Sequence, residues 1–218
     1  MRVYKKHDIR LQEILDAAQQ LFIGKGYEET TINDILSKVQ IGKGTFYHYF
    51  TSKEEVMNAV IYRIVDNSAN RARTIVADAT LNAHEKLFNI IVSQNITYTT
   101  DNDIIKELHR PSNAKMHQKS IVETIRSLSP ILADVVRQGI SEGTMHTPYP
   151  QESIEFVLTA NQFIFDAGIF QWQPQDYLSR AHAFVHMTEL ILGTQPGSLF
   201  FILDLLQKSA SEGMDHAH

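Results

Sequence analysis

Residues 42–50 carry side chains that can bind a nucleic acid from one face of a short helix. The apolar face of this helix comprises Phe46, Tyr49 and Phe50. The outward or flanking set comprises Lys43, Thr45, Tyr47 and His48, because positions three and four apart share a helix face. A lysine ammonium reaches a phosphate or a guanine edge, and a threonine methyl contacts thymine. Gly44 allows close approach of the backbone to DNA, so the segment has the composition of a recognition helix.

Three neighbouring helices must hold this segment in place, and periodicity and capping signals predict all of them. The first has one apolar stripe, formed by Ile14, Leu15, Ala18, Leu21 and Phe22, and it ends at the glycines of residues 24–26. The second begins at Thr31, with Asp34 at the capping-box position, and Ser52 with Glu55 gives the same signal for a fourth helix. Two short helices joined by a tight turn and braced by another present one helix to the major groove.

Helix N-termini supply further contacts to phosphate, because their free N–H groups attract anions. Thr31 and the pair Ser52–Lys53 occupy such positions. The basic residues Arg2, Lys5, Lys6 and Arg10 can add diffuse contacts. Two alternatives stay open at this point: the hydroxyls serve only as helix caps, and Tyr47 packs on its own domain.

The distribution of charge agrees with DNA binding by the N-terminal part. The whole chain has a net charge of −5. Residues 1–53 contain eight Lys and Arg against six Asp and Glu, whereas residues 54–218 contain twelve against nineteen. Only the first segment therefore has the sign that attraction to phosphate requires.

The run from Ile14 to Val60 resembles the DNA-binding domain of the tetracycline-repressor (TetR) family of bacterial regulators. The matching stretches are 14–18 with Leu21 and Phe22, 25–27, 30–35, 44–50 and 52–56. The resemblance implies a homodimer on a palindromic operator of double-stranded DNA, usually a repressor released by a small ligand. By position, it implies DNA contacts from Thr31, Lys43, Thr45, Tyr47, His48 and Lys53. Gln40 and Gly42 depart from the glycine and the small polar residue that the family often has around this turn.

The whole chain is expected to be all-α, with a helix-turn-helix DNA-binding domain at 1–53 and a helical-bundle domain for ligand binding and dimerisation at 54–218. The later helices are expected at 54–78, 84–100, 103–110, 118–142, 151–171, 175–194 and 198–211. Two of them, 151–171 and 175–194, offer more apolar surface than one small domain easily hides, as a four-helix bundle between two subunits would require. The alternative is that these faces serve only the core within one chain. Their apolar residues include Ile154, Val157, Leu158, Phe165, Ile169, Leu178, Ala181, Val185 and Leu192. The role of the 198–211 helix is left open.

The segment 154–172 is rich in aromatic residues with a few polar groups between them, which is typical of a ligand pocket. The residues expected to contact a small hydrophobic or amphipathic effector are Tyr98, His109, Met116, His117, Asn161, Phe165 and Trp172. An aromatic stripe at helical spacing is also typical of a plain core. His182 and His186 have the i, i+4 spacing of metal ligands, but we interpret them as surface or interface histidines and expect no metal or cofactor.

The composition narrows the class of protein further. The chain has no cysteine, which excludes disulfides and thiolate chemistry. It shows no signal peptide and no apolar run of roughly 20 residues, so a cytoplasmic protein is expected, with no membrane partner. Two other classes remain: a DNA-binding regulator controlled by a protein partner or by nothing, and, more remotely, a metal-dependent enzyme that uses the histidines. No catalytic constellation is found, and we expect no enzyme.

Overall fold

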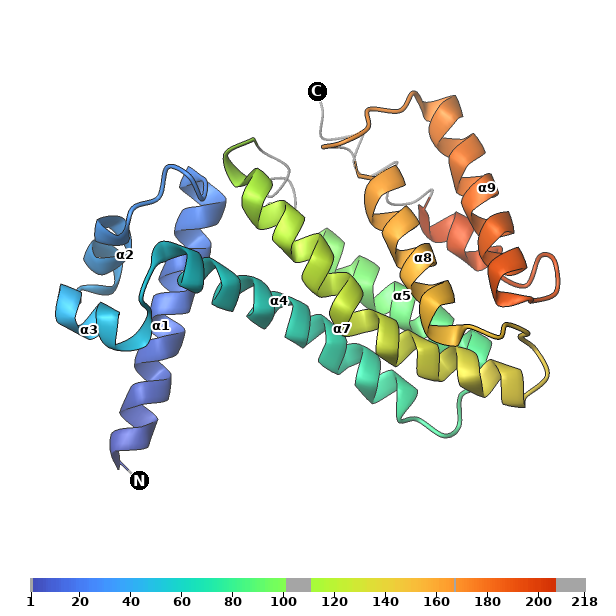
Figure 1. Cartoon of the computed structure of the whole chain (residues 1–218), viewed down its shortest axis with the longest axis horizontal. Coiled ribbons are helices and arrows are strands. Elements are labelled where there is room, and N and C mark those ends of the chain that lie inside the picture. The colour runs from blue at the N-terminus through green and yellow to red at the C-terminus, as the bar shows by residue number, and fades with distance from the viewer. Residues whose placement is uncertain (1, 101–110, 167, 207–218) are drawn as a thin grey trace. The chain divides into compact units, whose positions relative to one another are not determined.

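The computed structural model describes residues 2–100, 111–166 and 168–206, with the side chains of 2–6, 95–100 and 111 left out. All regular elements in these ranges are helices (Figure 1). In chain order they are α1 (Arg2–Lys25), α2 (Ile32–Val39), α3 (Lys43–Tyr49), α4 (Lys53–Val76), α5 (Ala83–Thr100), the 3-10 turn η1 (Pro111–Asn113), α7 (Ala114–Ser141), α8 (Pro150–Ile164) and α9 (Pro174–Leu192). A further helical stretch covers 201–206. The predicted all-α class is confirmed.

The chain divides into two compact units, which we call the head and the body. The head comprises Met1–Asp66 and Asp101–Glu123, and the body comprises Asn67–Thr100 and Thr124–His218. Both α4 and α7 start in the head and end in the body. The sequence predicts the DNA-binding domain at 1–53, whereas the head continues along α4 to Asp66 and also takes in the start of α7.

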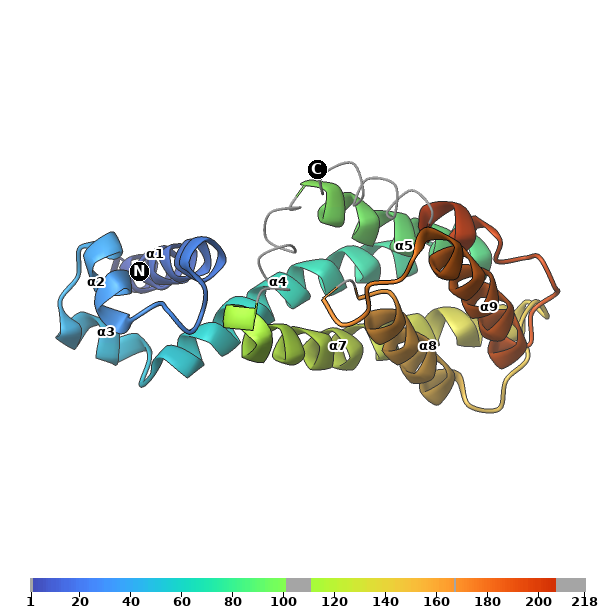
Figure 2. The same ribbon diagram turned by 90° about the horizontal axis from the view of Figure 1, so that it is seen from above.

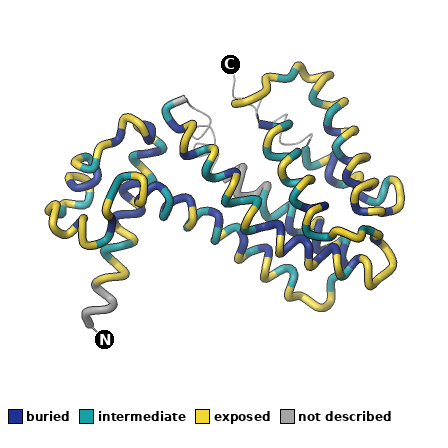
Figure 3. The backbone as a smooth tube through the Cα atoms, viewed as in Figure 1, coloured by how far each residue is buried: buried dark blue, intermediate teal, exposed yellow. Residues whose placement is uncertain are grey.

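The apolar stripe predicted for the first helix lies at the centre of the head core. Ile14, Ala18 and Phe22 of α1 are fully buried, and they belong to one cluster with Ile35 of α2 and Phe46 of α3 (Figure 3). Helices of seven or eight residues are marginal in water by themselves. Packing against α1 is therefore what keeps α2 and α3 helical.

A guanidinium group ties α4 to α1 within the head. Nη1 of Arg63 donates to Oε1 of Gln12 at 3.0 Å and to Oδ1 of Asp16 at 2.7 Å. Its Nη2 donates to Oε1 of Gln19 at 2.6 Å. These acceptors lie on one face of α1, at spacings of three and four residues, so a single side chain fixes the position of the start of α4 along the first helix.

The helix starts agree with the predicted caps, with one difference at α4. The capping box of Thr31 and Asp34 is present at α2. At α4, the Ser52 hydroxyl accepts the Glu55 N–H at 3.1 Å, as predicted. The Glu55 carboxylate, however, accepts from the N–H and the hydroxyl of Thr51, at 2.6 and 2.7 Å. These hydrogen bonds hold the pKa of Glu55 below its ordinary value, because they stabilise the ionised form.

The body has its own core, to which α4, α5, α7, α8, α9 and the segment after α9 contribute (Figure 2). Small residues of α4, Ala69 and Ala72, are fully buried there, as is Val135 of α7. Leu199 is also fully buried, and its N–H donates to the buried carboxylate of Glu189 at 2.9 Å. The segment around residue 199 is thus anchored to α9 by an apolar side chain and a charge-assisted hydrogen bond.

Several predicted helix limits are wrong, and the end of α8 is the most informative. The sequence predicts helix to residue 171, but α8 ends at Ile164. The carboxylate of Asp166 accepts the N–H groups of Gly168 and Ile169, at 2.7 and 3.2 Å, and thereby competes with helical pairing. The indole N–H of Trp172 donates to the Ile164 carbonyl at 2.8 Å and satisfies the helix end.

Two other predicted limits also differ from the structure. Helix α7 begins at Ala114, four residues before the predicted start. Residues 198–200 form turns ahead of the helical stretch 201–206. The helix predicted at 103–110 and the end of the one predicted at 198–211 lie outside the described residues.

Candidate nucleic-acid interface

The turn between α2 and α3 is held by an unusual backbone conformation. Gln40 has φ 57° and ψ 49°, in the left-handed region, and its N–H donates to the Leu36 carbonyl. Ile41 donates to the same carbonyl at 3.1 Å. Gly42 then begins α3 in an extended conformation, with φ −79°. The left-handed residue is therefore Gln40, at a position where the related family often has glycine.

Helix α3 places its aromatic anchors inward and its polar residues outward. Phe46 is fully buried and Phe50 is 5% exposed, whereas Tyr47 is 52% exposed. The other predicted outward residues, Lys43, Gly44, Thr45 and His48, are all exposed. The ring of Tyr47 meets that of Phe46 edge-on, at 5.5 Å between ring centroids. The phenol, the hydroxyl, the ammonium and the imidazole are thus gathered on one small exposed helix.

One residue of α1 extends this surface. The ring of His7 lies 4.6 Å from that of Tyr49 and 5.8 Å from that of His48, measured between centroids. His7 is itself exposed. Sequence reasoning missed this residue, since only the packing of α1 against α3 brings it to the same place.

Thr31, predicted to contact phosphate, serves as a helix cap. Its hydroxyl accepts the Asp34 N–H at 3.2 Å and donates to the Asp34 carboxylate at 2.8 Å. Lys25 also binds this carboxylate, at 2.7 Å. The Lys25 ammonium and the two hydrogen bonds from Thr31 lower the pKa of Asp34 to about 2. Thr31 is exposed, but its hydroxyl hydrogen points to a carboxylate that is ionised at neutral pH.

Lys53, the other phosphate contact predicted at a helix start, binds the loop after α1. Its ammonium donates to the carbonyls of Tyr27 and Glu28, at 2.8 and 3.1 Å. It also lies 4.4 Å from the centroid of the Tyr27 ring, a cation–π arrangement. The side chain is half-buried, so its charge is held in a fixed position beside the N-terminus of α4.

A residue far along the chain completes the loop between α1 and α2. The side chain of Asn113 is 1% exposed, and its Oδ1 accepts the N–H of Tyr27 at 2.6 Å. Its Nδ2 donates to the Phe22 carbonyl, near the end of α1, at 3.3 Å. The carbonyl of the preceding Ser112 accepts the N–H of Glu28 at 3.1 Å. The turn η1, directly before α7, therefore gives the N–H groups of Tyr27 and Glu28 their acceptors. It also adds a second donor to the Phe22 carbonyl, which accepts the Gly26 N–H at 3.1 Å.

Beside Asn113, the backbone of Gly26 lies close to the side chain of Ser112. Gly26 has φ +96°, and a Cβ placed on it would lie 2.7 Å from Oγ of Ser112. Met116 is 1% exposed and belongs to the head core. At the surface, Lys115 forms an ion pair with Glu54 at 2.9 Å. Sequence reasoning missed this docking, and the one available signal was a short polar residue directly before a helix.

The residues predicted to bind an effector are divided between the two units. Met116 and His117 lie in the head, and Met116 is part of its core. In the body, Phe165 packs on Tyr177 and Phe184, at 5.3 and 5.4 Å between centroids. His109 and the side chain of Tyr98 lie outside the described residues. Asn161 is half-buried near the end of α8.

Trp172 is fixed by its neighbours on both faces. It stacks on Phe170 with an interplanar angle of 11°, and the guanidinium of Arg180 lies 3.5 Å from its ring centroid. The N–H of Trp172 is also paired, so the position of the ring is fixed.

The predicted apolar residues of α8 and α9 face two ways. Ile154, Ala181, Val185 and Leu192 are buried in the core of the body. Exposed apolar residues lie elsewhere on the same helices: Phe156 (72%), Phe163 (43%), Met187 (55%) and Leu190 (62%). Of the other residues named from the sequence, Ile169 (44%) and Leu178 (43%) are exposed, so the apolar residues of this segment divide between the core and the surface.

His182 and His186 are exposed on α9. Across residues 2–100, 111–166 and 168–206, no cluster of three His, Asp or Glu residues is arranged to hold a metal ion. The helices in these ranges also include none that is long and apolar enough to cross a membrane.

Comparison with known proteins agrees with this arrangement of helices. The profile described as "Bacterial regulatory proteins, tetR family" matches residues 14–60, and that described as "Tetracyclin repressor-like, C-terminal domain" matches residues 95–187. The transcriptional repressor KstR2 of Mycobacterium tuberculosis is 30% identical over 145 residues, which cover 65% of this chain and 72% of that protein. The chain belongs to the TetR family of bacterial transcriptional regulators.

Other members of the TetR family show where the similarity is concentrated. An uncharacterised regulator of Lactococcus lactis is 49% identical over 61 residues, but these cover only 28% of this chain and 31% of that protein. A TetR-family regulator from Mesorhizobium loti has a similar fold, with 17% identity, a TM-score of 0.58, and coverage of 84% of this chain and 96% of the other. The matched proteins are regulators of transcription and not enzymes.

Gln40→Gly should stabilise the head by about 1 kcal/mol, because a side chain in the left-handed region costs roughly 1–2 kcal/mol that glycine avoids. The measurement is the free energy of unfolding from urea denaturation, compared with Lys38→Gly, an exposed position inside α2. The control should lose about 1 kcal/mol, as glycine does within a helix. Destabilisation by Gln40→Gly would show that the side chain, and not the backbone conformation, matters at this turn.

Proposed function

We propose that this regulator is a cytoplasmic homodimer that binds a palindromic operator through α3, acts as a repressor, and is released from DNA by a small effector. The exposed polar face of α3, mounted on the buried Phe46, is the observation that carries the proposal. A short helix with a cation, hydroxyl groups and an imidazole on its free face suits the major groove, where base edges differ in donors and acceptors.

The proposed contacts to DNA divide into two kinds. Lys43, Thr45, Tyr47 and His48 read bases or phosphates from α3, and Gly44 allows the backbone to come close. A Cβ on Gly44 would meet no described atom within 4 Å, so internal packing does not explain this glycine. Thr31 and Lys53 are the second kind, in which N–H groups at the starts of α2 and α4 attract phosphate. For Lys53 the fixed ammonium adds positive charge at the same place.

Dimerisation is supported by the apolar surface of α8 and α9. Phe156 and Phe163 are seven residues apart and therefore lie on one face of α8. Met187 and Leu190 of α9 share a face in the same way, and both are more than half exposed. Exposed apolar residues grouped in this manner mark an interaction surface. A second copy is the proposed occupant, because a palindromic operator needs two reading heads.

Release by an effector requires that the body influence the head. Two helices offer this connection, since α4 and α7 each run from one unit into the other. In η1, directly before α7, Asn113 holds Tyr27 and Phe22 through buried hydrogen bonds. An effector that favours another position of α7 would break these bonds or carry the head with it. Affinity for the operator then falls through a shift in population.

Effector contacts are proposed for part of the predicted set. Asn161, Phe165 and Trp172 lie in the body near the end of α8. Met116 is proposed to act differently, as a core residue that transmits the position of α7 to the head. The KstR2 relative is described as a repressor, which supports repression as the outcome of binding. Control by a protein partner is the alternative, and it predicts no effect of small molecules on operator affinity.

Lys43→Ala should weaken DNA binding in a way that depends on salt. A phosphate contact contributes about 0.9 to the slope of log affinity against log salt concentration. We expect the slope to become shallower by about 1 for each bound head, measured by fluorescence anisotropy with a mixed-sequence duplex. Arg137→Ala is the control, since Arg137 is an exposed cation of the body paired with Asp134. Equal slopes for Lys43→Ala and the parent protein would remove Lys43 from the phosphate contacts.

The double substitution Phe156→Glu and Leu190→Glu should convert the dimer to a monomer, because it places charges in an apolar interface in both copies. Sedimentation velocity measures the outcome. Tyr62→Glu is a matched control, since Tyr62 is a 63% exposed aromatic residue of α4 in the head. If the double variant sediments like the parent protein, the interface lies on another surface.

A further inference from the structure

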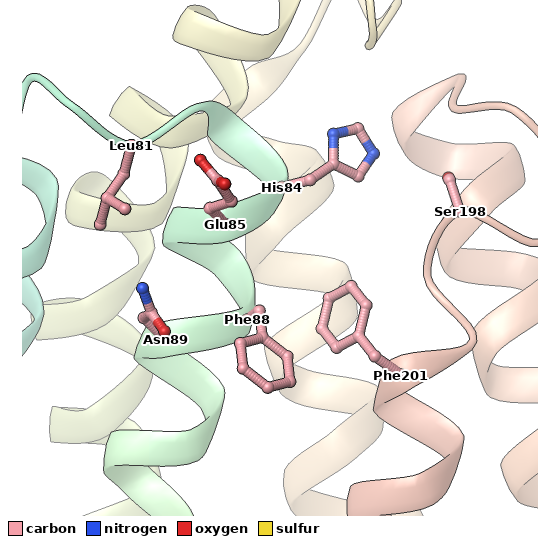
Figure 4. Close-up of a pocket in the computed structure, with 7 residues that line it drawn as sticks. All are labelled: Leu81, His84, Glu85, Phe88, Asn89, Ser198 and Phe201. Atoms are coloured by element: carbon pink, nitrogen blue, oxygen red, sulfur yellow. The ribbon is translucent and has the colours of Figure 1, made fainter.

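We infer that a hollow at the start of α5 binds a small, uncharged aromatic molecule that carries a hydroxyl group. The hollow has a volume of about 400 Å³ and lies within the body, between the first turns of α5 and residues 198–201 (Figure 4). This volume is within the range of small-molecule sites. The inference goes beyond the proposed function, because binding here does not require that the protein recognise an operator.

Two polar atoms on the walls of the hollow have no partner. Nε2 of His84 and Oγ of Ser198 are both buried and form no hydrogen bond within the described residues. The imidazole of His84 extends from α5 toward the segment that carries Ser198 (Figure 4). A buried polar group without a partner is costly, by about 1–3 kcal/mol. A ligand hydroxyl both donates and accepts a hydrogen bond. It can therefore pair with the Ser198 hydroxyl or with Nε2 of His84, whether or not that nitrogen carries a proton.

The floor of the hollow is aromatic. The rings of Phe88 and Phe201 meet edge to face, with 5.3 Å between centroids and an interplanar angle of 77°. Phe88 is 41% exposed although it lies beside the core of the body. In Figure 4 both rings lie on the same side of the hollow, below His84. A flat apolar ligand would cover Phe88 and add a third ring to this pair, which favours an aromatic compound.

The wall on α5 is held rigidly. Lys86, which is 5% exposed, donates from Nζ to the Val76 carbonyl and to Oε1 of Gln138, both at 2.8 Å. The N–H of Ala83 donates to the Glu142 carboxylate at 3.0 Å. This hydrogen bond and a second one from Gln138 hold the pKa of Glu142 below its ordinary value. The first turn of α5 therefore keeps its place when the hollow is empty, and little free energy is lost in ordering it.

The opposite wall is fixed as well, and the charge on the rim restricts the ligand. The buried Leu199, between Ser198 and the helical stretch 201–206, is anchored to Glu189. On the rim, Glu85 accepts the N–H of Asn82 at 2.8 Å, so its carboxylate is fixed beside the hollow. A ligand with a negative charge would be repelled. The site thus favours phenols and related aromatic alcohols over aromatic acids.

Three matched probes test this assignment on the full chain without DNA, so a failure of operator recognition does not affect the result. The probes are 2-naphthol, naphthalene and 2-naphthoate, with binding measured by equilibrium dialysis at neutral pH. We expect 2-naphthol to bind about tenfold more tightly than naphthalene, as one or two additional hydrogen bonds would give. We expect 2-naphthoate to bind most weakly. Equal affinities for 2-naphthol and naphthalene, or no binding of either, would overturn the proposal.

Substitutions then locate the site. His84→Ala and Ser198→Ala should each weaken 2-naphthol binding about fivefold and change naphthalene binding less than twofold. Phe88→Ala should weaken both about fivefold, and it is not expected to unfold the protein because Phe88 is partly exposed. His146→Ala is the control, since its side chain is exposed and lies outside the hollow. If the preference for 2-naphthol survives in the double variant of His84 and Ser198, the hydroxyl binds elsewhere and the assignment is wrong.

Discussion

Burial of Phe46 and Phe50 determines which side chains of α3 lie on the exposed face of the head. The two rings lie 6.1 Å apart and belong to the core formed with α1 and α2. Successive residues of a helix are turned by about 100°, so these two anchors fix the rotation of α3 about its axis. A rotation by one residue would bury Tyr47 and expose Phe46. The outward chemistry of α3 thus depends on apolar packing on its other side.

A second constraint comes from the backbone groups at the end of α1. The N–H of the buried Tyr27, in the loop after α1, needs a partner. The Phe22 carbonyl, near the end of α1, accepts the Gly26 N–H at 3.1 Å and can accept a second donor. The amide of Asn113 supplies both a donor and an acceptor, which an apolar side chain or a carboxylate cannot do. Stability of the loop that leads into the helix-turn-helix is thereby linked to the position of α7. The same few hydrogen bonds serve the fold of the head and connect it to a helix that continues into the body.

Local signals in the sequence were sufficient for the parts of the head that depend on local interactions. The cap at Thr31 and the orientation of Phe46 follow from spacing within a few residues, and the structure confirms both. The hydrogen bond between Asn113 and Tyr27 joins residues 86 positions apart. Sequence periodicity reflects only neighbours along the chain, so it cannot predict such a contact. A short polar residue before a helix is typical of an N-cap, but it does not indicate that its side chain pairs with the backbone of α1. The sequence places Met116 in an effector site for the same reason. An apolar side chain predicts burial, but it does not indicate the core in which the residue is buried, which here is that of the head.

The body shows the same division between local and distant causes. The apolar pattern predicted helices close to those observed, whereas the end of α8 depends on side chains of Asp166 and Trp172 that turn back to the backbone. The central claim, that paired heads read DNA through α3, is tested most directly by selection of binding sites from random duplex DNA at physiological salt. The account predicts an inverted repeat that is recovered by the parent protein and lost with Tyr47→Ala. Recovery of the same repeat by a variant that carries both Tyr47→Ala and Lys43→Ala would contradict it. The absence of any enriched sequence with freshly refolded parent protein would also contradict it.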